Sequence, residues 1–198
     1  MRKVLTYGFA FIVICTLGTG CVRILRSMPF SVARLKKEVM GILLFAIFYI
    51  LIIPICVVLH EVGHGLGVVL SSGARASIYI GKFNEKENKK NFHIGRLDFH
   101  IQWSYFGCCY SAGDLKKYQE LAFFIGGPLM SLILSLISFW LWSITSDGVF
   151  HSLFQGITMF SITQFLITAI PFKYPNWMGS YSGFSSDGLQ LLKILRSK

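Results

Sequence analysis

Four apolar segments dominate this chain, and each is long enough to cross a lipid bilayer as a helix. They cover residues 4–22, 41–70, 121–144 and 149–172. A membrane-spanning helix needs roughly 20 consecutive apolar residues, and 54% of the residues here are hydrophobic, more than soluble domains usually carry. The sequence therefore predicts a mainly α, polytopic membrane protein with about four transmembrane helices.

The first apolar segment follows Met1-Arg2-Lys3 and so resembles a secretory signal. A lipoprotein-type cleavage site would carry leucine or a similar residue three positions before its cysteine, but Gly18 occupies that position before Cys21. We expect an uncleaved helix. Residues 1–40 then form an N-terminal transmembrane helix with a basic linker, and residues 41–198 form the membrane-embedded core.

The net charge of +10 comes from lysines and arginines that cluster between the apolar segments. This placement is typical of orientation signals and of contacts with anionic lipid headgroups. No basic–aromatic pattern or known module indicates nucleic-acid binding. The counts favour both termini in the cytoplasm, and the composition suits a bacterial cell membrane. The two main basic clusters are Arg23, Arg26, Arg34, Lys36 and Lys37, and Lys82, Lys86, Lys89 and Lys90.

The stretch from residue 73 to residue 120 is the substantial polar part of the chain. Ala76–Ile80 and Phe92–Ile101 have strand-like content, and Gly81–Asn91 between them is typical of a solvated turn. We expect a small β-hairpin or sheet in this loop, at the membrane surface. An edge strand of the 76–102 region could hold an unwound peptide by strand addition.

His60-Glu61-Val62-Gly63-His64 is an H-E-x-x-H motif near the C-terminal end of the second apolar segment, on the side expected to face the cytoplasm. On a helix, the two histidines share one face and can bind one Zn²⁺, while Glu61 can act as general base on a water. The alternative interpretation is a pair of helix histidines with an incidental glutamate. A charge in an apolar segment is costly and usually functional, which favours the zinc site.

Two groups of small residues predict close packing between helices. Gly63, Gly65 and Gly67 thin the surface of the motif helix, so that another backbone can approach it. Gly126-Gly127-Pro128 is typical of a helix start with close packing, and we assign it a packing role rather than a catalytic one.

A catalytic zinc usually takes three protein ligands and leaves a fourth position for water. Asp187 is the strongest candidate for the third ligand, because it follows the last apolar segment and precedes another apolar run. Its alternative interpretation is a helix N-cap. His93 and His100 are the next candidates for the ligand.

The motif, the strand-rich loop, Gly126-Gly127-Pro128-Leu129 and Asp187-Gly188 occur in an order that resembles the site-2 protease family of intramembrane zinc metalloproteases. The resemblance extends from about Gly41 to Leu192. It implies that His60, His64 and Asp187 hold the zinc. The family often carries Asn-x-x-Pro before its aspartate, but this chain has Thr168-Ala169-Ile170-Pro171. Gln164 and Asn176 are therefore the candidates for a polar group that contacts substrate.

The sequence thus predicts an intramembrane zinc metalloprotease that hydrolyses peptide bonds in or near transmembrane segments of membrane proteins or in signal-peptide remnants. Glu61 would take a proton from water and return it to the leaving amine. A zinc peptidase of another lineage would need a glutamate as third ligand, and no second glutamate lies in an apolar segment. A non-proteolytic zinc-binding membrane regulator or immunity protein is the alternative from another class, although such a protein has no need of Glu61 as a base.

Overall fold

The computed structural model describes residues 32–81 and 90–197. The first predicted transmembrane segment, Cys21, and the basic residues before residue 32 and between residues 82 and 89 lie outside the described residues. The elements along the chain are α2 (Val32–Ile47), the π-helical turn η1 (Phe48–Ile52), α3 (Ile53–Ser71), β1 (Ala76–Ile80), β2 (Phe92–Ile94), β3 (Leu97–Ile101), β4 (Gly107–Ser111), α4 (Lys117–Ile144), α5 (Val149–Ala169), the 3-10 helix η2 (Asn176–Tyr181) and α6 (Asp187–Arg196).

The chain divides into two compact units. One contains the residues up to Leu43 together with Tyr174–Phe184, a segment closed by a hydrogen bond from the Tyr174 N–H to the Phe184 carbonyl. The other contains Leu44–Lys173 and Ser185–Lys198. The second unit therefore holds the H-E-x-x-H motif, the sheet and Asp187.

Three helices in the described part of the chain are long and apolar enough to cross a membrane: Lys36–Ser71, Lys117–Ile144 and Val149–Ala169. They correspond to the second, third and fourth predicted segments. The prediction of a mainly helical fold with several candidate membrane spans is confirmed to that extent. The first of the three helices has 36 residues, more than the roughly 20 that are needed to cross the hydrocarbon core.

The long helix changes its hydrogen bonding just before the motif. Pro54 lies in the first turn of α3, and proline has no N–H to donate to the carbonyl four residues earlier. That carbonyl belongs to Ile50, inside the π-helical turn η1. A π turn commonly accommodates such a local break, and α3 then continues without interruption to Ser71.

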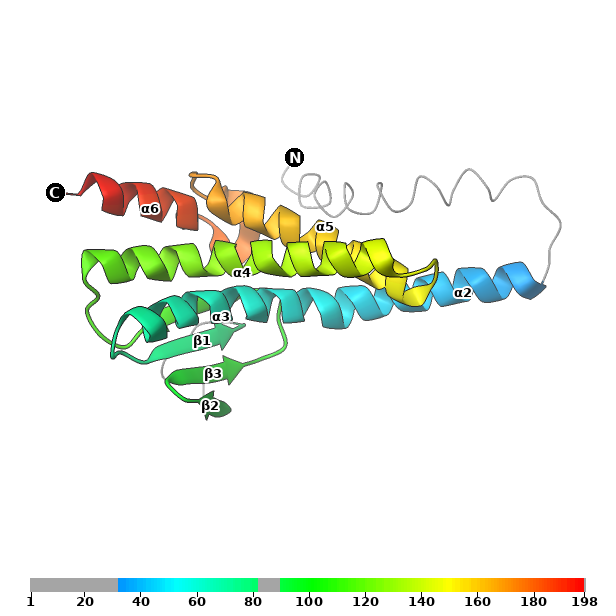
Figure 1. Cartoon of the computed structure of the whole chain (residues 1–198), viewed down its shortest axis with the longest axis horizontal. Helices are drawn as coiled ribbons and strands as arrows, with labels where there is room; N and C mark the ends of the chain where they lie inside the picture. Colours follow the sequence, from blue (N-terminus) through cyan, green and yellow to red (C-terminus); the bar gives the residue numbers. More distant parts are fainter. Residues whose placement is uncertain (1–31, 82–89, 198) are drawn as a thin grey trace. The chain divides into compact units, whose positions relative to one another are not determined.

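α3 lies between α4 on one side and the sheet on the other (Figure 1). Glycines allow the contact with α4: a Cβ on Gly63 would lie 2.3 Å from the Gly126 carbonyl oxygen, and one on Gly67 would lie 2.2 Å from the Ala122 carbonyl oxygen. Gly65 faces the sheet instead, where a Cβ would lie 2.8 Å from the Leu97 side chain. The close packing predicted for these glycines is confirmed.

Gly126-Gly127-Pro128 packs closely, as predicted, but the prediction that it begins a helix is wrong. α4 begins at Lys117, and Pro128 lies inside it. The helix starts earlier, at a first turn that the Gln119 side chain caps by accepting from the Lys116 N–H. The polar residues of this first turn hid the helix start, because the apolar run begins only at Leu121.

The loop between α3 and α4 forms a four-stranded sheet with the order β2-β3-β1-β4. β1 is parallel to β3 and antiparallel to β4, while β2 and β3 form a hairpin around Gly95, which has a φ of +58°. The predicted small sheet is confirmed. A hairpin between the 76–80 and 92–101 stretches is not formed, because the second stretch divides at Gly95 and its second half pairs in parallel.

The inner face of the sheet packs on α3 through Ile78, Ile80, Leu97 and Phe99, which are at most 7% exposed. Strands β1 and β3 each have a partner on both sides. Among the described residues, β2 is therefore the outer strand of the 76–102 region that we expected to bind an extended peptide, and β4 is the opposite outer strand.

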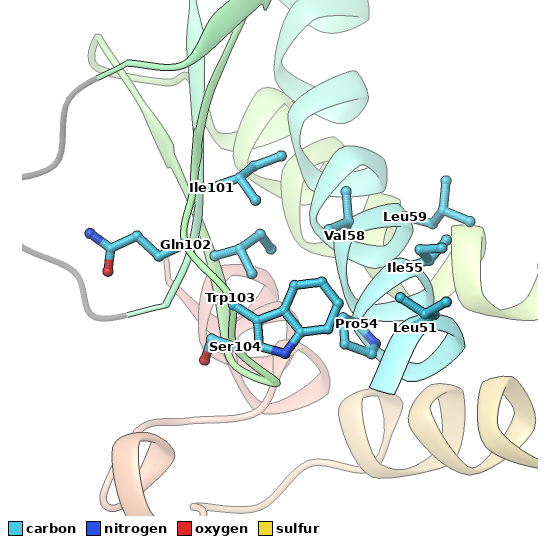
Figure 2. Close-up of a pocket in the computed structure, with 10 residues that line it drawn as sticks. Leu51, Pro54, Ile55, Val58, Leu59, Ile101, Gln102, Trp103 and Ser104 are labelled. Carbon is cyan, nitrogen blue, oxygen red and sulfur yellow. The ribbon is translucent and has the colours of Figure 1, made fainter. Parts of the chain in front are cut away.

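An apolar cavity of about 330 Å³ lies between the first half of α3 and the segment after β3 (Figure 2). Ile55 and Val58 on the helix face Ile101 and Trp103 across it. Val58 precedes His60 by two residues, which is a rotation of about 200° around a helix. The cavity therefore opens on the face of α3 that points away from the motif histidines.

Candidate metal centre

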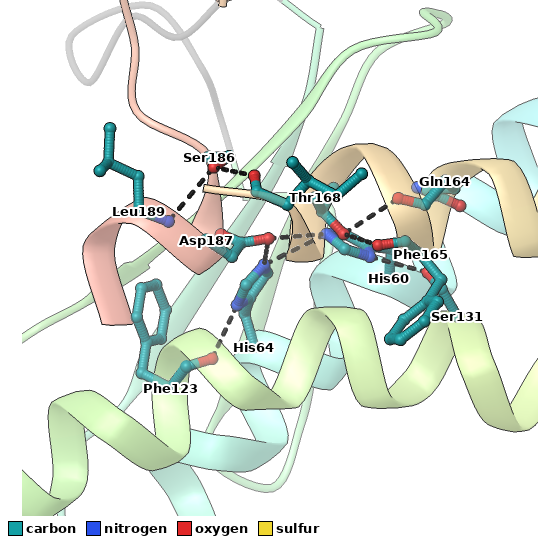
Figure 3. A network of polar contacts seen from close by, with 11 residues as sticks. His60, His64, Phe123, Ser131, Gln164, Phe165, Thr168, Ser186, Asp187 and Leu189 are labelled. Carbon is teal, nitrogen blue, oxygen red and sulfur yellow. Dashed lines mark hydrogen bonds and ion pairs between the residues drawn. The ribbon is translucent and has the colours of Figure 1, made fainter. Parts of the chain in front are cut away.

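Three potential ligand atoms converge beside α3 (Figure 3). The Nε2 atoms of His60 and His64 lie 3.3 Å apart, and Oδ2 of Asp187 lies 3.5 Å from the first and 3.4 Å from the second. Both histidines are buried. In the described part of the chain, these three residues form the one group of side chains placed to hold a metal ion.

The spacing of these atoms suits a tetrahedral metal. Zinc bonds of about 2.0–2.1 Å in a tetrahedron separate neighbouring ligand atoms by about 3.3–3.4 Å, and the three separations here are 3.3, 3.4 and 3.5 Å. Without a cation, the buried carboxylate is balanced only where an imidazole takes up a proton at Nε2, and a bound metal would take the place of that proton. The donor set and its spacing therefore fit Zn²⁺.

The hydrogen bond on the far side of the His64 ring fixes its tautomer. Nδ1 of His64 lies 2.7 Å from the Phe123 carbonyl oxygen. A carbonyl can only accept, so Nδ1 carries a proton, and in the neutral ring Nε2 is then the nitrogen with a free lone pair, as a metal ligand requires. Gly127 leaves the space that the same ring occupies, because a Cβ at that position would lie 2.2 Å from His64 Nε2.

His60 has an equivalent partner on α4. Its Nδ1 lies 2.8 Å from Oγ of Ser131, and both residues are almost fully buried, at 4% and 2% exposed. The sequence analysis missed Ser131 and the Phe123 carbonyl. The available signal was a spacing of four residues through Phe123, Gly127 and Ser131, which places all three on one face of a helix.

Asp187 is the first residue of α6, and its neighbour Ser186 is the N-cap. The alternative interpretation of Asp187 as the cap is therefore wrong. The Ser186 hydroxyl accepts from the Leu189 and Phe172 N–H groups and donates to the Ile170 carbonyl oxygen, which ties the start of α6 to the end of α5. A Cβ on Gly188 would lie 1.9 Å from the Ala169 carbonyl oxygen, so glycine is needed at this contact.

The Asp187 carboxylate is ionised near neutral pH. Burial on its own would raise its pKa, but in the metal-free site the interactions with His64 and His60 outweigh burial and hold the pKa at about 2. The start of a helix also favours a negative charge. An ionised carboxylate is the form that binds a metal.

Glu61 lies on a different face of α3 from the histidines. Its side chain packs against the first residue of β4, where a Cβ on Gly107 would lie 2.6 Å from Cγ and 2.9 Å from Oε1 of Glu61. Glu61 is 6% exposed, and its carboxyl is near enough to His60, His64 and Asp187 to interact with them electrostatically. The glutamate is thus close to the ligand group without belonging to it.

The cysteines beside Glu61 do not offer nucleophile chemistry. Burial, and then the charge of Glu61, raises the pKa of Cys108 to about 12. Burial raises the pKa of Cys109 well above its usual value as well. Both side chains are therefore neutral thiols near pH 7, and a thiol is a weak nucleophile and a weak metal ligand.

The other candidate ligands lie elsewhere. His93 is exposed on β2, and His100 stacks on Tyr79 with 4.3 Å between the ring centroids. The two candidates for substrate contact differ in their surroundings. Oε1 of Gln164 is buried and has no hydrogen-bond partner among the described residues, whereas the exposed Asn176 belongs to the other unit and accepts a hydrogen bond from Ser182.

The chain was compared with protein families, with curated proteins and with solved structures. No family model matches it, and no curated protein or solved structure is significantly similar to it. The candidate metal centre is therefore argued from the chain's own residues and their geometry.

Proposed function

We propose that this protein is an intramembrane zinc metalloprotease of the site-2 protease type, which hydrolyses peptide bonds in or near transmembrane segments of membrane proteins or in signal-peptide remnants. The observation that carries the proposal is the convergence of His60, His64 and Asp187 at 3.3–3.5 Å beside a buried Glu61. A site that only stores a metal needs the three ligands but not the glutamate.

His60, His64 and Asp187 would hold the zinc. When bound there, zinc would polarise a peptide carbonyl and lower the pKa of a water towards neutrality. The Glu61 carboxylate takes a proton from that water, whose oxygen then bonds to the peptide carbon. Glu61 returns the proton to the amide nitrogen as the carbon–nitrogen bond breaks, so that the products are a carboxylic acid and an amine.

The surroundings of the centre support a membrane substrate. Both histidines lie on the candidate membrane span Lys36–Ser71, and the contact with α4 places the second span beside them. A helical substrate has its carbonyls engaged in its own hydrogen bonds, so it must unwind before the bond can be attacked. Gln164, with its buried and unpartnered Oε1, is our candidate for a side chain that contacts the unwound segment.

The test compares cells that produce the wild type with cells that produce Glu61→Gln. The new N-termini of membrane-protein fragments are catalogued by mass spectrometry, and the zinc content of each purified protein is measured. We expect Glu61→Gln to keep its zinc and to lose cleavage by a factor of about 10²–10⁴, the usual contribution of a general acid–base group. Asp187→Ala is expected to lose both zinc and cleavage.

The same comparison distinguishes the alternative from another class. If Glu61→Gln keeps its zinc and every fragment and phenotype is unchanged, the protein is a non-proteolytic zinc-binding regulator or immunity protein instead.

A further inference from the structure

One face of α4 supports both motif histidines. Phe123 and Ser131 are eight residues apart, Gly127 lies midway between them, and positions four apart on a helix share a face. Phe123 holds His64 through its backbone carbonyl, and Gly127 gives that ring room. Ser131 holds His60. α4 thus makes one hydrogen bond to each ring, and only the bond to His60 comes from a side chain.

A hydroxyl can accept or donate, so the direction of the bond to His60 matters. If Nδ1 of His60 donates to Ser131, Nε2 presents a lone pair towards Asp187 and His64, as a metal requires. If the bond ran the other way, Nε2 would carry a proton and compete with a cation. Nε2 lies 3.3 Å from His64 Nε2 and 3.5 Å from Asp187 Oδ2, so the first direction is the one that lets all three atoms bind one metal ion.

We propose that Ser131 is a positioning residue for the metal centre: its hydroxyl accepts the Nδ1 proton of His60 and so holds the ring in the tautomer and orientation that bind zinc. This inference rests on the metal centre of the proposed function, but it does not rest on proteolysis. A positioning partner of this kind typically changes metal affinity by a factor of 10–100.

Ser135 provides the matched control. It lies one turn beyond Ser131 on the same face of α4 and is also buried, at 5% exposed, but it is displaced by about 6 Å along the helix. A general effect of removing a buried hydroxyl from α4 would therefore appear in both Ser131→Ala and Ser135→Ala. An effect through His60 would appear in Ser131→Ala alone.

The experiment uses the full chain, purified in detergent, with Zn²⁺ and Co²⁺ as probes. Affinity is measured by competition with a chelator, the ligand geometry by the visible absorption of bound Co²⁺, and the His60 tautomer by ¹⁵N chemical shifts. We expect Ser131→Ala to weaken metal binding 10–100-fold, to alter the Co²⁺ spectrum and to mix the His60 tautomers. Ser135→Ala should behave as the wild type does.

Ser131→Thr keeps the hydroxyl and is expected to restore the affinity to within a few-fold of the wild type. Thermal unfolding of the metal-free proteins shows whether each variant is folded. The inference is overturned if Ser131→Ala binds metal with wild-type affinity and spectrum, or if Ser135→Ala loses as much. In that case, cleavage that depends on Glu61 would still support the proposed protease. Conversely, if Ser131→Ala alone loses metal affinity but no cleavage is found in any cells, the Ser131 inference stands and the protease proposal is overturned.

Discussion

Gly127 and His64 are in such close contact that no larger residue fits between α4 and the imidazole. A Cβ on Gly127 would lie 2.2 Å from Nε2 and 2.5 Å from Cε1 of His64. The atom that would be displaced is the proposed zinc ligand itself. The glycine is therefore part of the geometry of the metal centre, even though it contributes no ligand.

Gly127→Ala is expected to push the His64 ring away from Asp187 and to weaken zinc binding at least tenfold, because overpacking forces side chains out of position. Chelator competition measures the change. Gly41→Ala is the control, since a Cβ at Gly41 meets nothing within 4 Å and alanine favours the helix. Equal zinc affinity in the two variants would contradict the prediction.

Gly107→Ala is expected to separate catalysis from metal binding. The new Cβ would overlap Cγ and Oε1 of Glu61, and its three nearest atoms all belong to Glu61 rather than to a ligand. We predict zinc content equal to that of the wild type and a clear loss of cleavage. Gly113→Ala, at a glycine with open space around it, should retain both. Full cleavage by Gly107→Ala would show that the position of Glu61 does not limit the reaction.

Ser186→Ala removes the hydroxyl that joins three backbone groups at the start of α6. Loss of an N-cap costs about 0.5–2 kcal/mol, and Asp187 is the next residue. We expect lower thermal stability and weaker zinc binding. Ser185→Ala is the neighbouring control, because among the described residues the Ser185 hydroxyl accepts only from the exposed Lys193 amine. Unchanged zinc affinity in Ser186→Ala would mean that Asp187 is positioned by other contacts.

The ion pair of Asp98 makes the stability of the sheet depend on pH. It accepts two hydrogen bonds from Arg75 at 2.9 and 2.7 Å and one from Lys90, and the Arg75 bonds above all lower its pKa to about 2. An unfolded aspartate has a pKa of about 3.9. The ion pair therefore stabilises the fold above about pH 4, and this stabilisation is lost as the pH falls towards 2.

Asp98→Asn should abolish that part of the pH dependence. The thermal unfolding of the metal-free wild type and variant is measured between pH 2 and pH 6. The difference between the two proteins is expected to be largest at pH 6 and to shrink on acidification. A constant difference across the range would exclude the ion pair as its source.

The residues of the centre that lie on one helix turn could be predicted from the sequence, because His60 and His64 are neighbours by helix geometry alone. Asp187 required more: its spacing and a family resemblance singled it out, and the structure brings it to the histidines. The contacts from Ser131 and Gly107 were not predicted. Both depend on how α4 and β4 pack against α3. The spacing of four residues up to Ser131 shows a shared helix face, but it does not show that this face lies against the histidines.

The pairing of the strands in the sheet could not be predicted from the sequence either. Local composition indicated the strands at 76–80 and 92–101, but the parallel pairing of β1 with β3 depends on a crossover between distant residues rather than on a turn. β4 was not predicted, because Gly107-Cys108-Cys109 lacks the alternation of a half-buried strand. Its place beside Glu61 emerges only from the register with β1.

The third ligand reaches the centre from far along the chain. Asp187 follows His64 by 123 residues, and α4 and α5 are both made before it. During synthesis, the two histidines therefore have an incomplete set of ligands until α6 docks against the end of α5. If the chain is the protease that we propose, it would stay inactive until this last helix is in place.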